Sequence, residues 1–222
     1  MNLNVEGFQT IFQGGTGEIL MKKSRFIATI SPVSTEEEAL EFIEGLKKKY
    51  WDASHNCYAY VIGTKNPLMR CSDDGEPSKT AGKPMLDILL AQELTNLVVV
   101  VTRYFGGTLL GTGGLVKAYQ AATLEGLQQC LIIKKELGLR MKLTTDYNLI
   151  GKIQYFIGQE ELPILTSDYS EVVSLEVLVP ISKISSFEKK ITELSNGSVL
   201  PSIIEQAYFA VINKEVHLFQ IN

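Results

Sequence analysis

The sequence has few cysteines and no long apolar run. Cys57, Cys71 and Cys130 are an odd number without a CxxC pair, which argues against a disulfide framework and against a zinc-ligand pattern. The longest aliphatic run covers residues 97–101, far short of the roughly 20 residues that a membrane-spanning helix needs. The first residues show no basic stretch followed by an apolar segment, so we expect no signal peptide, no membrane partner and a cytoplasmic location.

A strongly basic composition is also missing. The formal net charge is −4, with 12 Lys and Arg against 14 Asp and Glu in residues 1–131, and 9 against 11 in residues 132–222. Proteins that hold duplex nucleic acid by neutralising phosphates usually carry a basic domain or stripe. The overall charge gives no sign of such a basic domain or stripe, so any basic groove has to be local.

The chain does contain enough apolar material for two packed domains. Its 222 residues are long for one ordinary domain of roughly 100–150 residues, and 45% of them are hydrophobic. Segments with the alternation typical of strands are interspersed with segments of helical periodicity. This pattern predicts a two-domain α+β protein.

The first domain is expected to cover residues 1–134. Alternating or β-branched runs predict strands at residues 25–30, 56–62 and 97–105. Helices are expected at about 35–49, 84–93 and 113–127, the first with acidic residues in its first turn and lysines in its last, as the helix dipole favours. Residues 10–20 indicate an edge strand or a hairpin, and residues 63–82 a polar stretch rich in turns.

The second domain is expected to cover residues 138–222, after a short charged stretch that ends at Gly138. Its pattern predicts strands at 139–144, 163–167, 172–179 and 198–207, with helices at 147–159 and 184–195 and a terminal strand within 209–221. That βαββαβ order is the ferredoxin-like arrangement.

A charged loop precedes the second predicted helix. Asp73, Asp74, Glu76, Lys79 and Lys83 lie within eleven residues, together with the conformationally special Gly75, Pro77 and Gly82. Two interpretations stay open for this segment. It is a binding loop, or it is a surface turn whose charges pair with one another.

A glycine-rich segment follows the most strongly predicted strand. Five of the 18 glycines lie between that strand and the third helix: Gly106, Gly107, Gly111, Gly113 and Gly114. Glycine allows close approach to the backbone, and a helix amino end offers N–H groups to a phosphate or carboxylate. We expect Thr112 as N-cap and Arg103 as a further anion donor. Alternatively, the glycines serve only tight packing.

Signals for catalysis are weaker. The glycine string matches neither the GxGxxG fingerprint nor a Walker A loop, and neither a serine-hydrolase elbow nor a zincin motif occurs. His55 precedes a predicted strand, and His217 is expected to be structural. We therefore assign no catalytic residue, no metal site and no cofactor.

These strings together resemble the IMPACT family, in its bacterial YigZ-like branch. They follow one another over about 100 residues: Lys23-Ser24-Arg25-Phe26, His55, Asp73-Asp74-Gly75-Glu76-Pro77, Thr80-Ala81-Gly82-Lys83-Pro84, Arg103-Tyr104-Phe105-Gly106-Gly107, Leu110-Gly111 and Tyr119. The resemblance implies a ribosomal-protein-like β-α-β first domain, similar to domain IV of elongation factor G. It implies a ferredoxin-like second domain, similar to domain V of that factor.

The same resemblance implies translational control for the eukaryotic members, which carry a different partner domain. We therefore expect a translation-associated binding protein that contacts RNA, the ribosome or a translation-factor surface. Two alternatives stay open, a metal-assisted enzyme acting on a phosphorylated or nucleotide substrate and a protein-interaction module. The oligomeric state stays open as well. The expected binding residues are His55, Asp73, Asp74, Glu76, Lys79, Thr80, Lys83, Arg103, Tyr104, Gly106, Gly107, Gly111, Gly113 and Gly114.

Overall fold

The computed structural model describes residues 6–221 as two compact units. The N-terminal unit is Phe8–Lys134, and the C-terminal unit contains the described residues from Lys135 on, with Glu6 and Gly7. The predicted α+β class and two-domain organisation are confirmed. The division lies inside strand β7 (Leu131–Thr145) and not in a loop. Within residues 6–221, no helix has both the length and the apolar character needed to span a bilayer.

The N-terminal unit is built on a five-stranded antiparallel sheet. Its strand order is β2 (Gly15–Met21), β3 (Ser24–Pro32), β6 (Leu97–Tyr104), β4 (His55–Ile62) and β5 (Leu68–Ser72). The central β6 is the β-branched run, and helices cover both of its faces, as expected for so apolar a strand. Three helices complete the unit: α1 (Glu36–Lys49), α2 (Gly82–Ala91) and α3 (Thr112–Gln128).

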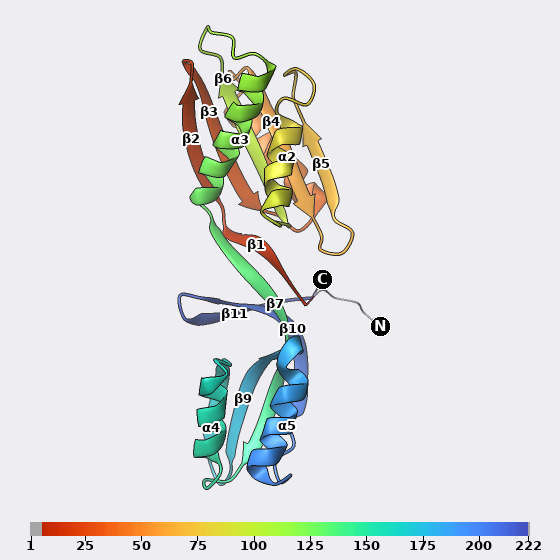
Figure 1. The fold of residues 1–222 in the computed structure, drawn as a ribbon, viewed down its shortest axis with the longest axis vertical. Helices are drawn as coiled ribbons and strands as arrows, with labels where there is room; N and C mark the ends of the chain where they lie inside the picture. The colour runs from red at the N-terminus through yellow and green to blue at the C-terminus, as the bar shows by residue number, and fades with distance from the viewer. Residues whose placement is uncertain (1–5, 222) are drawn as a thin grey trace. The chain divides into compact units, whose positions relative to one another are not determined.

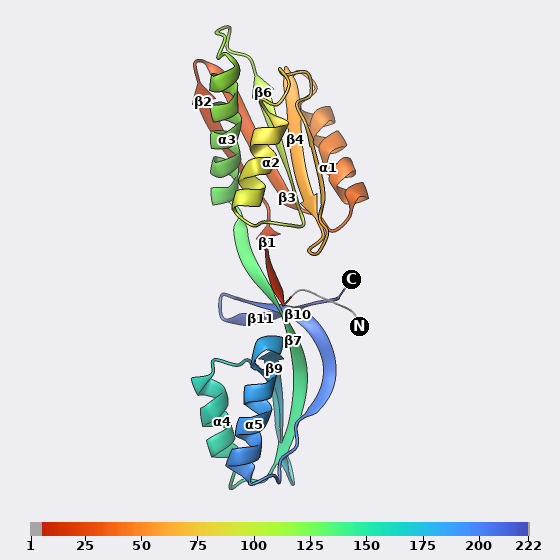
Figure 2. The same cartoon turned by 45° about the vertical axis from the view of Figure 1, so that its right-hand side comes forward.

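The helices form a layer on each face of this sheet (Figure 1, Figure 2). α2 and α3 pack on one face over a core that includes Phe26, Val99 and Tyr119. α1 packs on the other face, where Ile43 contacts a second cluster. The Thr35 hydroxyl accepts a hydrogen bond from the Glu38 N–H at 3.2 Å and so caps α1 at the predicted start.

Two segments are defined only by the structure. Of the two alternatives for residues 10–20, the edge strand is confirmed, because β2 lies at the edge of the five-stranded sheet, and β1 (Gly7–Gln13) pairs with β7 and not with β2. Strand β5 lies in the stretch predicted to be polar and rich in turns, where no strand was predicted. β5 is an edge strand with mostly exposed side chains, so it lacks the apolar alternation that marks a half-buried strand.

The C-terminal unit is built from β7 and the elements that follow it in the chain. They are β7, α4 (Ile150–Gln159), β8 (Ile164–Tyr169), β9 (Val173–Pro180), α5 (Ile184–Ser195) after the short 3-10 helix η1 (Ile181–Lys183), β10 (Ser202–Ile212) and β11 (Glu215–Phe219). From β7 to β10 this is the predicted βαββαβ order, and the sheet runs β11-β10-β7-β9-β8. α4 and α5 supply Ile153, Ile157, Phe187 and Ile191 to a core shared with β7 and β9.

Helix α3 lies unusually close to β2 because glycines replace side chains between them. A Cβ atom added at Gly17 would lie 2.6 Å from the backbone carbon of Glu125, and one added at Gly126 would lie 2.8 Å from the Ala28 Cβ. Real Cβ atoms do not approach backbone so closely. These glycines therefore set the distance between α3 and the sheet.

We expect Gly17→Ala to lower the free energy of unfolding by about 1–3 kcal/mol, because α3 would have to move away from β2. Gly45→Ala is the matched control, since Gly45 lies in helix α1 with no atom within 4 Å of the added Cβ. That change should stabilise by about 0.5–1 kcal/mol through helix propensity. Urea unfolding of both variants measures the difference, and equal effects would contradict the proposed packing role.

Candidate functional site

Four loops meet at one end of the N-terminal unit. The sheet register pairs Arg25 with Tyr104 and His55 with Arg103, so β3 and β4 begin where β6 ends. α2 and α3 also begin at this end (Figure 1, Figure 2). The structure thereby brings together the charged loop and the glycine-rich segment, which are far apart in the sequence.

A pocket of about 530 Å³ lies between these loops. Its lining residues come from the loop after α1, the charged loop, the end of β6 and the start of α3. They are Ser54, His55, Gly75, Glu76, Pro77, Arg103, Phe105, Leu109, Leu110, Gly111, Thr112 and Leu115. Among the predicted binding residues, the lining therefore includes His55, Glu76, Arg103 and Gly111.

The amino end of α3 forms one wall of this pocket. The N-cap is Gly111, whose φ of 72° lies in the left-handed region that favours glycine. Thr112, predicted to be the N-cap, is instead the first helical residue, so this prediction was wrong. The first backbone hydrogen bond of the helix runs from the Leu115 N–H to the Gly111 carbonyl. The preceding N–H groups have no side-chain cap within the described chain and are free for an anion.

A buried ion pair forms the floor of the site. Arg103 Nη1 lies 2.6 Å from Glu76 Oε1, and the two side chains are only 7% and 3% exposed. The Tyr119 hydroxyl donates a second hydrogen bond to the same carboxylate oxygen at 2.8 Å. Arg103 Nε is buried and has no hydrogen-bond partner within residues 6–221. The buried guanidinium of Arg103 therefore has one N–H donor, Nε, without a partner among the described residues.

Cys57 and Tyr119 extend this network away from the pocket. The Cys57 thiol donates to the Tyr119 hydroxyl at 3.3 Å. Burial raises the pKa of the Cys57 thiol and of the Tyr119 phenol far above their usual ranges. Both groups therefore stay protonated, and Cys57 is not poised as a thiolate nucleophile.

His55 is held by the charged loop. Its Nδ1 lies 2.8 Å from the Asp74 carbonyl oxygen, which can only accept, so Nδ1 carries the proton. In the neutral ring, Nε2 is then an acceptor, and it lies 3.9 Å from Glu76 Oε2. His55 thus offers an imidazole of fixed orientation to the pocket wall.

The two aspartates of the charged loop hold the loop itself. Asp73 Oδ1 accepts from the backbone N–H groups of Ala81 and Gly82 at 3.0 and 2.9 Å, so it caps the amino end of α2. Asp74 Oδ2 accepts from the Asn56 N–H at 2.7 Å. In residues 6–221, no three His, Cys, Asp or Glu side chains converge in a way that could hold a metal ion.

The remaining predicted binding residues surround the pocket without lining it. The Thr80 hydroxyl donates to the Pro77 carbonyl at 2.6 Å, and Lys83 pairs with Asp87 on the exposed side of α2. Lys79 is exposed. Tyr104 donates to Asp52 at 2.8 Å. Gly106, Gly107, Gly113 and Gly114 flank the lining residues along the glycine-rich segment. The lysines therefore do not join Arg103 in one groove.

Sequence reasoning missed the apolar wall of the pocket. Leu109, Leu110, Leu115 and Phe105 line it, although nothing in their local pattern separates them from ordinary packing residues. The exposure of Phe105 and Leu109 in the folded unit is what identifies them. The lining therefore combines uncapped N–H groups at the start of α3 with apolar side chains from the same segment.

We expect Glu76→Ala to lower the free energy of unfolding by about 3–5 kcal/mol, because it leaves the buried Arg103 charge without its partner. Glu18→Ala is the matched control, since Glu18 pairs with Arg25 at 2.7 Å on the exposed surface. That control should leave stability nearly unchanged. Urea unfolding monitored by circular dichroism measures both, and a small loss for Glu76→Ala would show that the pair does not organise the site.

Comparison with known proteins identifies relatives of both units. The family model for the Impact N-terminal domain matches residues 22–127, and that for a domain of unknown function, DUF1949, matches residues 143–198. IMPACT family member YvyE of Bacillus subtilis is 40% identical over 96% of this chain and 97% of its own length. IMPACT family member YigZ of Escherichia coli is 38% identical over 84% of this chain and 92% of its own length.

A crystal structure described as that of a hypothetical protein is similar as well. It superposes with a TM-score of 0.58 at 36% identity, covering 91% of this chain and 99% of the other. The relatives thus match both units in one continuous chain. The chain belongs to the IMPACT family, among its two-domain bacterial members.

Proposed function

We propose that this chain is a translation-associated binding protein, whose N-terminal unit takes an anionic group of RNA, the ribosome or a translation factor into the pocket at the amino end of α3. The single observation that carries the proposal is the uncapped start of α3 beside Arg103, a buried cation with an unused Nε donor. Family membership supports the link to translation, because the eukaryotic members are implicated in translational control.

Helices α2 and α3 both begin at this end, and the difference in how their first N–H groups are bonded supports an anionic ligand. α2 has its first N–H groups occupied by the Asp73 carboxylate. α3 has the same partial positive charge at its start but no carboxylate to meet it within the described chain. A carboxylate or phosphate from a partner would complete α3 as Asp73 completes α2.

Charge sets the expected strength of this binding. Arg103 is already paired with Glu76, and the chain as a whole carries a charge of −4. Binding therefore depends on a few directed donors and not on a broad basic groove of Arg103, Lys79 and Lys83. We expect modest affinity that weakens with salt.

The metal-assisted enzyme has less support from the same geometry. The carboxylates of Asp73 and Asp74 accept hydrogen bonds from backbone N–H groups, and Glu76 is bound to Arg103 and Tyr119. These hydrogen bonds occupy carboxylate oxygens that would otherwise be available to coordinate a magnesium ion. The binding protein is therefore the function that we propose.

The finer fold assignment belongs to the same proposal. We propose that the N-terminal unit is similar to domain IV of elongation factor G and that the C-terminal unit is ferredoxin-like. The βαββαβ element order and the sheet order β10-β7-β9-β8 support the second assignment.

Thr112→Asp tests the pocket, because Thr112 is exposed at the first helical position. The new carboxylate would cap α3 and repel an incoming anion, so the variant should be at least as stable as the wild type. Its co-sedimentation with bacterial ribosomes at low salt should fall by about tenfold or more.

Thr112→Asn is the control for this experiment, since it has the size of the aspartate without its charge, and it should bind nearly as well as the wild type. Wild-type protein that fails to co-sediment at low salt would contradict the proposal. So would a Thr112→Asp variant that binds as strongly as the Thr112→Asn variant.

A further inference from the structure

Exposed aromatic side chains gather beside the pocket. Trp51 is 82% exposed and Phe105 is 47% exposed. The Phe105 N–H donates to the Ser54 hydroxyl at 3.4 Å, and the Tyr104 hydroxyl donates to Asp52 at 2.8 Å. These two hydrogen bonds hold the loop after α1 against the end of β6. Trp51 and Phe105 therefore lie on two segments that are hydrogen-bonded to each other, the loop after α1 and the end of β6.

Four exposed lysines lie on the segments next to these aromatic residues. Lys22 and Lys23 form the exposed turn between β2 and β3, and Lys48 and Lys49 end α1 just before Trp51. The backbone of Lys23 lies so close to Gly106 that a Cβ atom there would be 2.0 Å away, which places the turn beside the glycine-rich segment. We call Lys22, Lys23, Lys48, Lys49, Trp51 and Phe105 the basic aromatic end.

Nearby acidic groups do not cancel this charge. Glu18 is paired with Arg25 at 2.7 Å. Asp52 accepts the hydrogen bond from the neutral Tyr104 phenol and keeps its negative charge, so it offsets only one of the four lysine charges. The basic aromatic end is therefore a local positive region on a chain of net negative charge. A polyanion is the partner that complements it.

We propose that the basic aromatic end binds single-stranded RNA, with Trp51 and Phe105 stacking on unpaired bases and the lysines contacting phosphates. This inference rests on the proposed function, since Phe105 also lines the pocket. An RNA strand with a phosphate at the start of α3 presents its neighbouring bases to Phe105.

The chemistry favours single strands over other partners. Aromatic side chains stack on bases that are splayed out, whereas bases in a duplex already stack on one another. Lysine is depleted in protein–protein interfaces, so four lysines around two exposed rings fit a nucleic acid better than a protein. Stacking is tolerant of sequence, and no base preference is expected.

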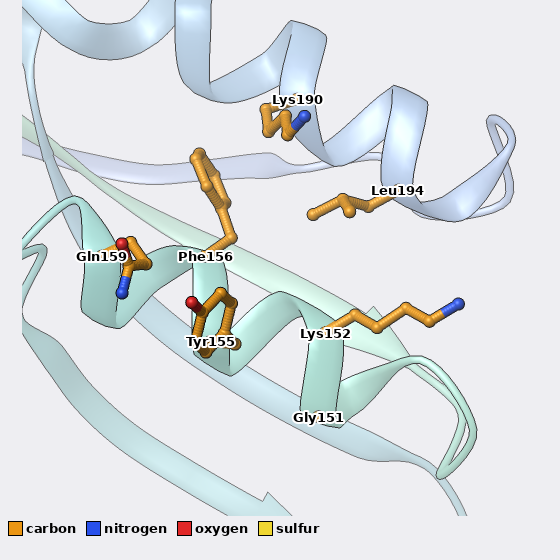
Figure 3. Close-up of a pocket in the computed structure, with 7 residues that line it drawn as sticks. All are labelled: Gly151, Lys152, Tyr155, Phe156, Gln159, Lys190 and Leu194. Atoms are coloured by element: carbon orange, nitrogen blue, oxygen red, sulfur yellow. The ribbon is translucent and has the colours of Figure 1, made fainter.

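The C-terminal unit offers an internal control. A groove of about 500 Å³ between α4 and α5 is lined by Lys152, Tyr155, Phe156, Lys190 and Leu194, among others. Figure 3 shows Tyr155 and Phe156 projecting from α4 and Lys190 and Leu194 from α5. Tyr155 is 71% exposed and belongs to the other unit, which makes Tyr155→Ala the matched aromatic truncation outside the set of residues that defines the basic aromatic end.

The first measurement uses the intrinsic fluorescence of Trp51, the single tryptophan of the chain. At low salt, an unstructured 12-nucleotide RNA should quench this fluorescence in a saturable way. The same RNA annealed to its complement should bind at least about tenfold more weakly, because its bases are not free to stack. Equal binding of the duplex would overturn the proposal, and so would the absence of quenching.

The second measurement uses fluorescence anisotropy of labelled RNA with variants of the full chain. Trp51→Ala and Phe105→Ala should each weaken binding by about tenfold, and Tyr155→Ala should bind as the wild type does. The double change Lys22→Gln with Lys23→Gln should lower the slope of log affinity against log salt by about 1.4, at about 0.7 for each lysine. A larger loss for Tyr155→Ala than for Trp51→Ala would overturn the proposal.

The two proposals fail in different ways. Suppose that Thr112→Asp weakens ribosome co-sedimentation while Trp51→Ala and Phe105→Ala leave RNA binding unchanged. The proposal for the pocket is then supported, and the proposal that the basic aromatic end stacks on RNA is overturned. If Thr112→Asp has no effect on co-sedimentation while the single-stranded RNA still quenches Trp51, the pocket is overturned.

Discussion

The ion pair between Arg103 and Glu76 is the interaction on which the site depends. It joins the end of β6 to the charged loop across 27 residues of sequence, with both side chains buried. Removing two charges from water is costly, and the cost is offset only where the geometry is good and further hydrogen bonds are made. Tyr119 donates the further hydrogen bond to Glu76, so helix α3 is tied to the same pair. The pocket forms because these three elements are held together.

The polar groups at this site are of two kinds. Some hold the charged loop in place, and others have no partner among the described residues. Asp73 and Asp74 bind backbone N–H groups and fix the path of the loop. The buried Nε of Arg103, a residue that lines the pocket, and the exposed, uncapped start of α3 are donors without a partner among the described residues. Folded proteins rarely leave buried donors unsatisfied, so the buried Arg103 Nε, which has no partner within residues 6–221, is what distinguishes this site from an ordinary stable turn.

Glycine has two separate tasks in the N-terminal unit. At Gly17 and Gly126 it allows α3 to lie against the sheet, and at Gly111 it allows the left-handed turn into the helix without adding a capping side chain. A capping serine or aspartate at that position would occupy the N–H groups that an anion needs. Within the glycine-rich segment itself, Gly106 is needed for close packing, since a Cβ atom there would lie 2.0 Å from the Lys23 backbone, whereas a Cβ atom at Gly111 would meet nothing within 4 Å.

The sequence by itself determined the elements that have strong local signals. The β-branched run of β6, the Thr35 cap of α1, the order of the C-terminal elements and the family resemblance all followed from neighbouring residues. Only the tertiary structure decided which charges meet. It paired Glu76 with Arg103, left Lys79 and Lys83 outside the pocket, and made Gly111 the cap in place of Thr112. The reason is physical, because local patterns encode backbone preference, whereas side-chain partners depend on the register of strands and loops distant in the chain.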